Sequence, residues 1–473
     1  MLEPLSCGVE VAVVLTVGDA VRGNAGPYRL AGIPDGLAVL AHPDGTASLF
    51  VNHELQARQG ARRAHGARGA FVSRWTLAPD GRVVHGEDLI RRVLFPGPEG
   101  WREHTTAFER FCSADLPPPG ALTYAGLGTR ARLLLTGEET TARWNPKRRY
   151  GRAFAQVVTG PLAGTSYALP RLGRLAFENV LLNPHPGPLT IAMLPDDADA
   201  APNFSTGPLL HLKPPSELYV YVGTKQAHGN PVERAGLTNG RLYGLRVPGL
   251  RAEDPEHGLG RDGYRRRARF ELVSFGDVSD DETGKTLQKH SVERGVMQFR
   301  RLEDGAWDTR EPAVFWVVTT DRPGGHSRLW RLRFDDLGAP WRGGAIEIAL
   351  EGRAHGIEMM DNLTVDPWGR LLIQEDPPGD RLARIWLFDP DTGRVQAVAR
   401  AHPAWFDPRA EPLTTDEETT GIVPAFDVLG DGGYFLAVQA HAPTGEPDTV
   451  EHGQILRLHV PRSLRARCND PGA

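Results

Sequence analysis

The sequence predicts an all-β protein, and three observations favour a β-propeller. The chain of 473 residues contains 54 glycines and 39 prolines spread along its length, which favours short strands joined by turns. Short apolar runs rich in β-branched residues alternate with Gly- and Asp-containing turns, and helical periodicity is poor. The runs recur at spacings close to those of propeller blades, which are four-stranded sheets stacked around a central channel. A protein of two β-sandwich domains is the main alternative.

The N-terminal half predicts antiparallel strands interrupted by a proline-rich region. Residues 93–125 contain several prolines, so we expect loops there, with a short helix around residues 103–112. Residues 180–194 predict a hairpin that turns at 184–188. Further strands are expected at 11–15, 37–40, 48–51, 71–77 and 131–135.

The C-terminal part has the most regular strand pattern. The segment 250–295 is dense in charge, and we expect it to be a solvated insertion with a helix near residues 284–294. Residues 1–473 are therefore predicted to form a single β-propeller domain with a charged insertion around 250–295. Its later strands are expected at 315–318, 328–332, 371–373, 384–388, 434–438 and 455–458.

Composition and charge exclude some classes of partner. The formal net charge is −5, and no block of lysine or arginine stands apart from acidic neighbours, so no nucleic-acid partner is expected. No apolar run is long enough to cross a bilayer, so no membrane span is expected. The first residues lack the basic region and cleavage site of a signal peptide. Either the protein is cytoplasmic or the export signal is missing from this chain.

The cysteines do not form a local metal motif. Cys7, Cys112 and Cys468 are far apart and include no C-x-x-C spacing, so they do not predict a zinc or iron–sulfur site. A disulfide between Cys7 and Cys468 would tie the chain ends together if the fold brings the termini side by side. Unpaired cysteines are the alternative.

Acidic residues repeatedly follow apolar runs, and this pattern predicts a metal site. In a propeller the innermost strand of each blade lines the channel, so polar residues at such strand ends would face the axis. Carboxylate oxygens at this density suit calcium or another oxygen-seeking cation. For any single residue, an ordinary turn after a strand is the alternative. The candidates are Glu54, Glu138, Glu139, Glu178, Asp196, Asp361 and Glu375.

Arg301 and Glu303 form a second candidate feature, an arginine close to a carboxylate. They are two residues apart, so strand periodicity places both side chains on one face. An arginine beside a metal-binding carboxylate suits a phosphate ester, because the planar guanidinium can bind two non-bridging oxygens. An ordinary surface ion pair is the alternative.

One longer segment resembles a known family. Met360 to Asp376 resembles the Asp-Asn-x-x-x-Asp-x-x-Gly stretch of the PhoX-type alkaline phosphatases, which are propellers of a six-bladed type that use calcium with iron. Further resemblances follow in the same order along most of the chain, from Asn52 to His441. They lie at Asn52-His53-Glu54, Thr136-Gly137-Glu138-Glu139, Gly173 to Glu178, Asp196-Asp197, Arg301-Leu302-Glu303, Glu418-Thr419-Thr420-Gly421 and Gln439-Ala440-His441.

The resemblance implies a propeller of about six blades that hydrolyses a small phosphoester in a secreted or periplasmic setting. Arg301 would bind the phosphoryl group, and calcium would be the cofactor. The family's thiolate iron ligand falls at Gly137 and a family histidine falls at Phe177, which argues against iron. The implied metal ligands are Glu54, Glu138, Glu139, Glu178, Asp196, Glu303, Asp361 and Glu418.

Three functions are compatible with these features. The first is a calcium-dependent phosphoester hydrolase. The second is a non-catalytic propeller that uses calcium structurally and binds a partner. The third is a calcium-dependent lactonase or esterase. A serine hydrolase has little support, because the chain lacks a Gly-x-Ser-x-Gly nucleophile elbow.

Overall fold

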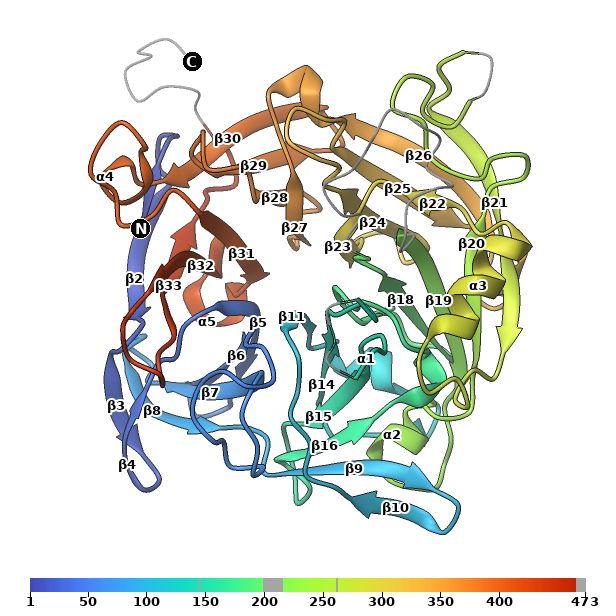
Figure 1. Ribbon diagram of the computed structural model, residues 1–473, viewed down its shortest axis with the longest axis horizontal. Helices are drawn as coiled ribbons and strands as arrows, with labels where there is room; N and C mark the ends of the chain where they lie inside the picture. The colour runs from blue at the N-terminus through green and yellow to red at the C-terminus, as the bar shows by residue number, and fades with distance from the viewer. Residues whose placement is uncertain (144, 146, 199–215, 261–262, 465–473) are drawn as a thin grey trace.

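Sheets of mainly antiparallel strands stand around a central axis in this computed structural model, which describes residues 1–143, 145, 147–198, 216–260 and 263–464 (Figure 1). Six strands lie nearest the axis, and each contacts the next until the ring closes on the first. This closed arrangement of radial sheets is a β-propeller. The inner strands are β5 (Pro34–Ala41), β11 (Phe111–Asp115), β17 (Leu181–Leu182), β23 (Leu302–Trp307), β27 (Met360–Val365) and β31 (Glu417–Pro424).

The first two sheets run outward from the axis. From β5 the order is β6 (Ala47–His53), β7 (Phe71–Leu77) and β8 (Val83–Asp88). From β11 it is β14 (Leu133–Glu138), β15 (Ala153–Val157), β16 (Thr165–Ala168), β9 (Arg92–Gly97) and β10 (Gly100–Glu103). Two hairpins stand apart from them, β3 (Ala20–Gly23) with β4 (Gly26–Arg29) and β12 (Thr123–Tyr124) with β13 (Leu127–Gly128).

The sheets that start at β17 and β23 are joined at their outer edges. From β17 the order is β18 (Leu189–Pro195), β19 (Ser216–Thr224), β20 (Arg241–Arg246) and β21 (Arg267–Gly276), and β22 (Gln298–Phe299) also pairs with β19. From β23 it is β24 (Val314–Thr319), β25 (Arg328–Phe334) and β26 (Gly344–Glu351). The β21–β26 pair merges the two into one continuous sheet, so the number of blades stays a prediction.

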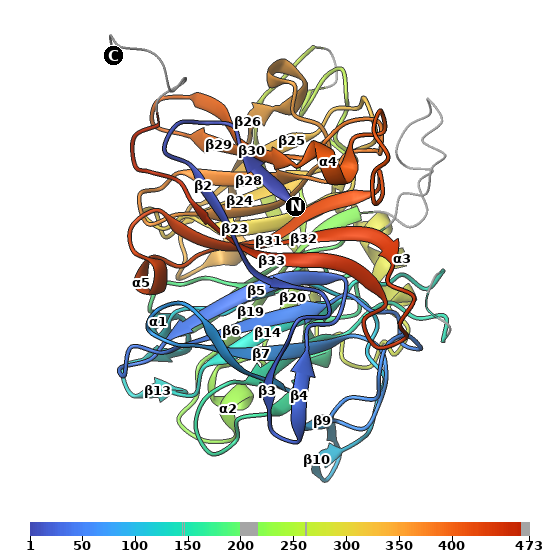
Figure 2. The same cartoon turned by 90° about the vertical axis from the view of Figure 1, so that its left-hand side faces the viewer.

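Strands from the N-terminus complete the last two sheets. From β27 the order is β28 (Leu371–Glu375), β29 (Arg384–Asp389), β30 (Arg394–Ala401) and finally β1 (Leu2–Pro4). From β31 it is β32 (Gly433–Pro443), β33 (Glu451–His459) and finally β2 (Glu10–Thr16) (Figure 2). The start of the chain therefore hydrogen-bonds to its end and closes the ring.

Apolar side chains fill the spaces between neighbouring sheets. Phe108, Phe111 and Phe154 pack together where the β5 sheet meets the β11 sheet, and Trp316 meets Phe388 between the β23 and β27 sheets. The helices are short and lie in connections between strands. They are α1 (Pro119–Leu122), α2 (Pro231–Arg234), α3 (Lys285–Arg294), α4 (Pro403–Phe406) and α5 (Phe426–Leu429).

The structure confirms the all-β class, the propeller, the hairpin at 180–194 and the helix near 284–294. The helix predicted around 103–112 is wrong, because β10 ends at Glu103 and Phe111 begins the strand that pairs with β14. The single-domain boundary stays a prediction. Cys468, the predicted partner of Cys7, lies outside the described residues. Among the described helices none is long and apolar enough to cross a membrane.

The segment 250–295 is only partly the solvated insertion that its charge predicts. Its residues 267–276 form β21, which pairs on both sides. Glu253, in the same segment, is fully buried and receives a hydrogen bond of 3.0 Å from the equally buried Arg328 of β25. Arg328 also donates to the backbone carbonyls of Asp254 and Pro255. A buried cation therefore attaches this charged segment to the propeller.

Replacing Arg328 with alanine should lower the free energy of unfolding by about 3–5 kcal/mol, because Glu253 would remain buried without its partner. Urea denaturation measures the change. The matched control is Arg333→Ala on the same strand, whose ion pair with Glu311 is about half exposed and should contribute less than about 1 kcal/mol. Similar losses in the two variants would contradict the role assigned to Arg328.

Candidate metal centre

Four inner strands begin with the same unusual backbone geometry. The residue just before each strand has a positive φ although it is not glycine: Ile33 (49°), Arg110 (35°), Arg301 (62°) and Met359 (46°). Its carbonyl accepts a hydrogen bond of 2.9–3.0 Å from the backbone N–H of a residue that follows the second strand of the same sheet. These donors are Glu54, Glu139, Thr320 and Asp376.

A β-bulge follows immediately in each of these strands. The second and third residues of the strand together face a single residue of the neighbouring strand. Bulges re-aim side chains and are frequent beside active sites. Here the bulge gives the second residue of each strand an equivalent position near the axis. Those residues are Asp35, Cys112, Glu303 and Asp361.

These bulge residues belong to one continuous arc of potential metal ligands. Three groups have ligand atoms within 4.8 Å of one another: Asp35 with Glu54 and Cys112, Cys112 with Glu139 and Glu178, and Glu178 with Glu303 and Asp361. Consecutive groups share Cys112 and then Glu178. The arc therefore crosses four inner strands and two second-strand ends, and it offers oxygen ligands with one thiol.

Burial and mutual repulsion act strongly on these carboxyl groups. Burial raises the pKa of Glu178 well above its ordinary value, and Asp361, Asp304 and Glu139 raise it further. The pKa values of Asp304 and Asp376 rise to about 6, in both cases mainly through burial. Burial also raises the pKa values of Asp35, Glu139, Glu303, Asp361 and Glu418 well above the ordinary range.

Two arginines lie over this cluster. Arg110 forms ion pairs with Glu54 and Glu139. Burial acts to raise the pKa of Glu54, but Arg110 holds it below its ordinary value. Arg301 binds Asp197 at 3.1 Å and Glu303 at 2.8 Å. Both arginines line an open cavity of about 570 Å³, together with Gln56, Ala57, Arg58, Glu109, Glu139, Thr140, Thr141 and Asp197.

The donor set fits hard cations. The Oε1 atom of Glu178 accepts a hydrogen bond of 2.7 Å from Ser113, but its Oε2 atom is buried without a hydrogen-bond partner among the described residues. The cluster also holds far more carboxylates than guanidinium groups. Bound cations would satisfy the free oxygen and offset the repulsion, and oxygen ligands are those that calcium prefers. Cys112 would add a soft ligand of the kind that transition metals use.

The structure brings most of the sequence-predicted residues together. Glu54, Glu139, Glu178, Glu303, Asp361 and Glu418 lie in the cluster, and Arg301 lies beside it. Cys112, Asp35 and Arg110 also belong there, although the sequence interpretation did not select them. Asp35 precedes the strand expected at 37–40 and does not follow an apolar run, and Cys112 fell in the wrongly predicted helix. The repeated positive φ and bulge, which relate Arg110 to Arg301, have no clear sequence signal.

Three predicted ligands have other partners. Arg152 binds both carboxylate oxygens of Glu138. Asp196 accepts hydrogen bonds of 2.8 Å from the Ala176 N–H and 2.7 Å from Gln288. Glu375 is held by Arg381 through both of its oxygens. Their oxygens are already used to hold neighbouring segments.

Gly137 and Phe177, the two positions at which this chain lacks the metal ligands of the PhoX-type family, lie next to each other in the structure. A Cβ atom on Gly137 would lie 2.1 Å from the Cβ of Phe177, so no larger residue fits there without movement of the backbone. The thiol of Cys112, on the neighbouring strand, nevertheless reaches the centre. The glycine at position 137 therefore does not leave the cluster without a potential sulfur ligand.

Comparisons with known proteins support the fold. No family model and no curated protein sequence matches the chain. Among solved structures, Pseudomonas fluorescens PhoX in complex with vanadate, a transition state analogue, superposes with a TM-score of 0.68 at 14% identity, covering 97% of this chain and 96% of that one. A Dyadobacter fermentans protein of unknown function gives a TM-score of 0.46 at 10% identity, covering 97% and 99% of the two chains. At these identities the likeness to PhoX shows the propeller fold alone.

Removing metal should make stability depend on pH. In the metal-free protein the carboxyl groups of the cluster other than Glu54 have pKa values above their unfolded values of about 4, so the folded state binds more protons than the unfolded state. Stability should therefore fall as pH rises from about 4 through the raised values near 6, by about 1.4 kcal/mol for each unit of raised pKa.

Melting temperatures measured with a chelator at pH 5 and pH 7.5 test this expectation. The chelated protein should melt at a lower temperature at pH 7.5, and added calcium should remove most of the difference. Equal melting temperatures in all four conditions would contradict a metal-dependent centre.

Proposed function

We propose that this protein is a metal-dependent phosphoester hydrolase whose centre uses calcium. The single observation that carries the proposal is that two arginines paired with a buried, carboxylate-rich cluster line one open cavity, together with Glu139 of that cluster. The overall likeness to the PhoX structure, whose bound vanadate is called a transition state analogue, agrees with this reading. If the merged sheet is divided at the β21–β26 pair, the proposed enzyme is a six-bladed propeller.

The arginines favour an anionic substrate over a neutral ester. Arg110 and Arg301 keep 43% and 26% of their side-chain surface exposed, so a ligand in the cavity can reach both. Each guanidinium can present two parallel N–H donors to phosphoryl oxygens. A neutral lactone would offer no charge to match them, which makes a small phosphoester the better substrate class.

In this proposal the carboxylates and the thiol bind metal, and the two arginines hold the substrate. Asp35, Glu54, Glu139, Glu178, Glu303, Asp361 and Glu418 would hold the cations, with Cys112 as a soft ligand. When bound, such cations supply Lewis acidity toward phosphoryl oxygens and make water more acidic. Arg301 would orient the phosphoryl group and stabilise the charge that builds up on it, while Asp197 and Glu303 hold its guanidinium in place. Arg110 would act in the same way from the equivalent position before β11.

Replacing Arg301 with alanine should reduce kcat/KM for p-nitrophenyl phosphate at least about 100-fold while calcium content stays unchanged. Elemental analysis and turnover with and without chelator measure the two properties. Arg22→Ala, which removes an exposed arginine remote from the cavity, is the matched control. Bound calcium without turnover in the unchanged protein would favour a non-catalytic propeller. An equal loss of neutral-ester turnover would give Arg301 a different role.

Replacing Cys112 with serine should lower the content of iron or other transition metals, because serine removes the one soft ligand in the arc. Calcium content should remain within error of the unchanged protein, since the oxygen ligands persist. Elemental analysis of both proteins purified in parallel measures the effect. Identical metal profiles would show that the thiol is no ligand.

A further inference from the structure

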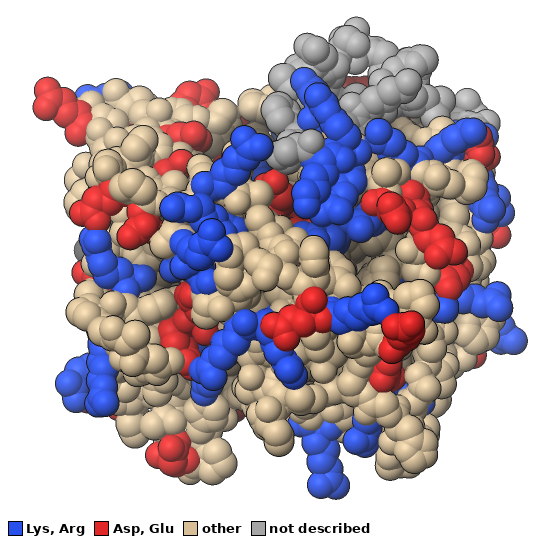
Figure 3. Space-filling view, turned by 60° about the horizontal axis from the view of Figure 1, so that its bottom comes forward, with Lys and Arg blue, Asp and Glu red and all other residues tan. Residues whose placement is uncertain are grey.

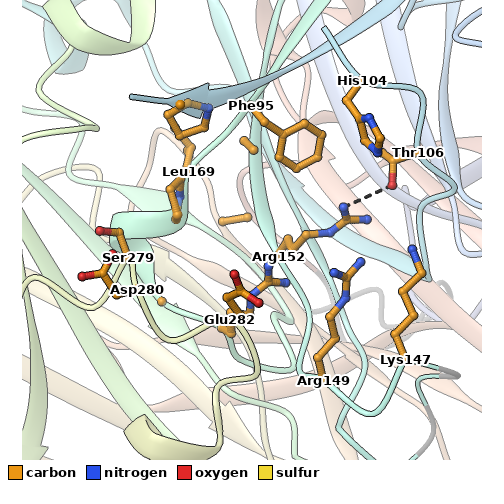
Figure 4. Close-up of a pocket in the computed structure, with 17 residues that line it drawn as sticks. Phe95, His104, Thr106, Lys147, Arg149, Arg152, Leu169, Ser279, Asp280 and Glu282 are labelled. Carbon is orange, nitrogen blue, oxygen red and sulfur yellow. Dashed lines mark hydrogen bonds between the residues drawn. The ribbon is translucent and has the colours of Figure 1, made fainter. Parts of the chain in front are cut away.

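A second cavity, of about 580 Å³, lies outside the metal centre beside β9, β15 and β16. One wall is apolar and includes Phe95, Leu169 and Pro170 (Figure 4). The other wall carries four cations, Lys147, Arg149, Arg152 and Arg174. On the face shown in Figure 3, basic side chains likewise gather beside a hollow.

Three of these cations form no ion pair with a described carboxylate, and Glu138 acts on them only from beyond ion-pair distance. Arg152 binds Glu138, but Lys147, Arg149 and Arg174 make no side-chain hydrogen bond or ion pair with any described residue. The Nε atom of Arg149 and the Nη1 atom of Arg174 are buried without a partner. Buried donors that lack partners are costly to leave unsatisfied, so they point to a ligand that the protein binds.

Electrostatics supports the same conclusion. Burial lowers the pKa of Arg174 to about 10, and the neighbouring Arg149 and Arg152 lower it further. The same two causes, burial first and adjacent arginines second, lower the pKa values of Lys147 and Arg149. An anion placed among these groups would remove their repulsion. The acidic residues that line this cavity, Asp280 and Glu282, are exposed and do not form an ion pair with them.

We propose that this cavity binds a phosphate group, free or carried on a small organic molecule, without the help of metal. Several donors converge from one side, as a phosphate with its multiple oxygens requires, and two arginines can each contribute a fork of N–H groups. The apolar wall of Phe95, Leu169 and Pro170 suits the organic part of a phosphomonoester. The site is distinct from the metal centre because no residue lines both cavities.

The connection between the two sites is short. Arg152 lines this cavity and binds both oxygens of Glu138, and the next residue, Glu139, belongs to the metal centre. Binding of phosphate here does not require catalysis at the centre. The proposal therefore stands or fails separately from the proposed function.

Chemical labelling of Lys147 gives a readout confined to this cavity. The purified protein is acetylated in phosphate-free buffer with increasing inorganic phosphate, and mass spectrometry follows each lysine. Phosphate should protect Lys147, whereas the exposed Lys289 on α3 should be modified equally throughout. The Arg149→Ala and Arg174→Ala variants should each need at least about tenfold more phosphate for half protection. The Arg22→Ala control should behave like the unchanged protein.

The same labelling separates this site from the metal centre and tests its ligand. Arg301→Ala should leave the protection of Lys147 unchanged. Phenylphosphonate, a stable mimic of a phosphomonoester, should protect at lower concentration than phosphate if the organic part contacts the apolar wall, and at similar concentration if free phosphate is the ligand. The proposal would be overturned if neither phosphate nor phenylphosphonate changed the acetylation of Lys147. It would also be overturned if the anions no longer protected Lys147 in the Arg301→Ala variant but still protected it in the Arg174→Ala variant. Arg149 has no described side-chain partner, so its variant should fold normally, as circular dichroism would verify.

Discussion

The crowding of carboxylates around one axis is the constraint on which the rest of this structure depends. Water is excluded from these groups, and each raises the pKa of its neighbours. Ionised carboxylates in such a place are tolerable only when cations balance them. Arg110 and Arg301 supply part of that balance from the protein itself, and a metal centre would supply the remainder. The closed ring of six inner strands fixes the positions at which the charges meet.

Local backbone strain accompanies the placement of these charged groups near the axis. Left-handed conformations are unfavourable for Arg110, Arg301, Ile33 and Met359, none of which is glycine, and strain of this kind concentrates at functional sites. The hydrogen bond from the end of the second strand to the strained carbonyl repeats in all four sheets, so the geometry is a built feature of the fold. This geometry turns the following bulge residue toward the axis. In two of the four sheets the strained residue is itself an arginine, Arg110 or Arg301, and its side chain lies beside the carboxylate cluster.

The sequence predicted the strand ends well but not which residue of each end faces the centre. Adjacent residues of a strand point to opposite sides, so a shift of one position exchanges a ligand for a structural residue. At one strand end Glu138 pairs with Arg152 while Glu139 reaches the centre. Asp196 and Glu375 are likewise held by neighbouring segments. Cys112 and Asp35 escaped prediction because each lies near the start of its inner strand and does not follow an apolar run, and the bulges that aim them depend on long-range pairing. Glu303 and Asp361 occupy the same bulge position, but they were selected from motifs that resemble the PhoX-type family.

The end of β14 links the two proposed binding sites through this alternation. Glu138 compensates one of the four cations of the basic cavity, and Glu139 compensates Arg110 at the candidate metal centre. Because the two carboxylates are consecutive, their guanidinium partners are kept on separate sides of one strand end. The basic cavity can therefore retain its excess positive charge a short distance from the excess negative charge of the centre. This separation of negative charge from positive charge suits a protein that binds cations at one site and phosphate at the other.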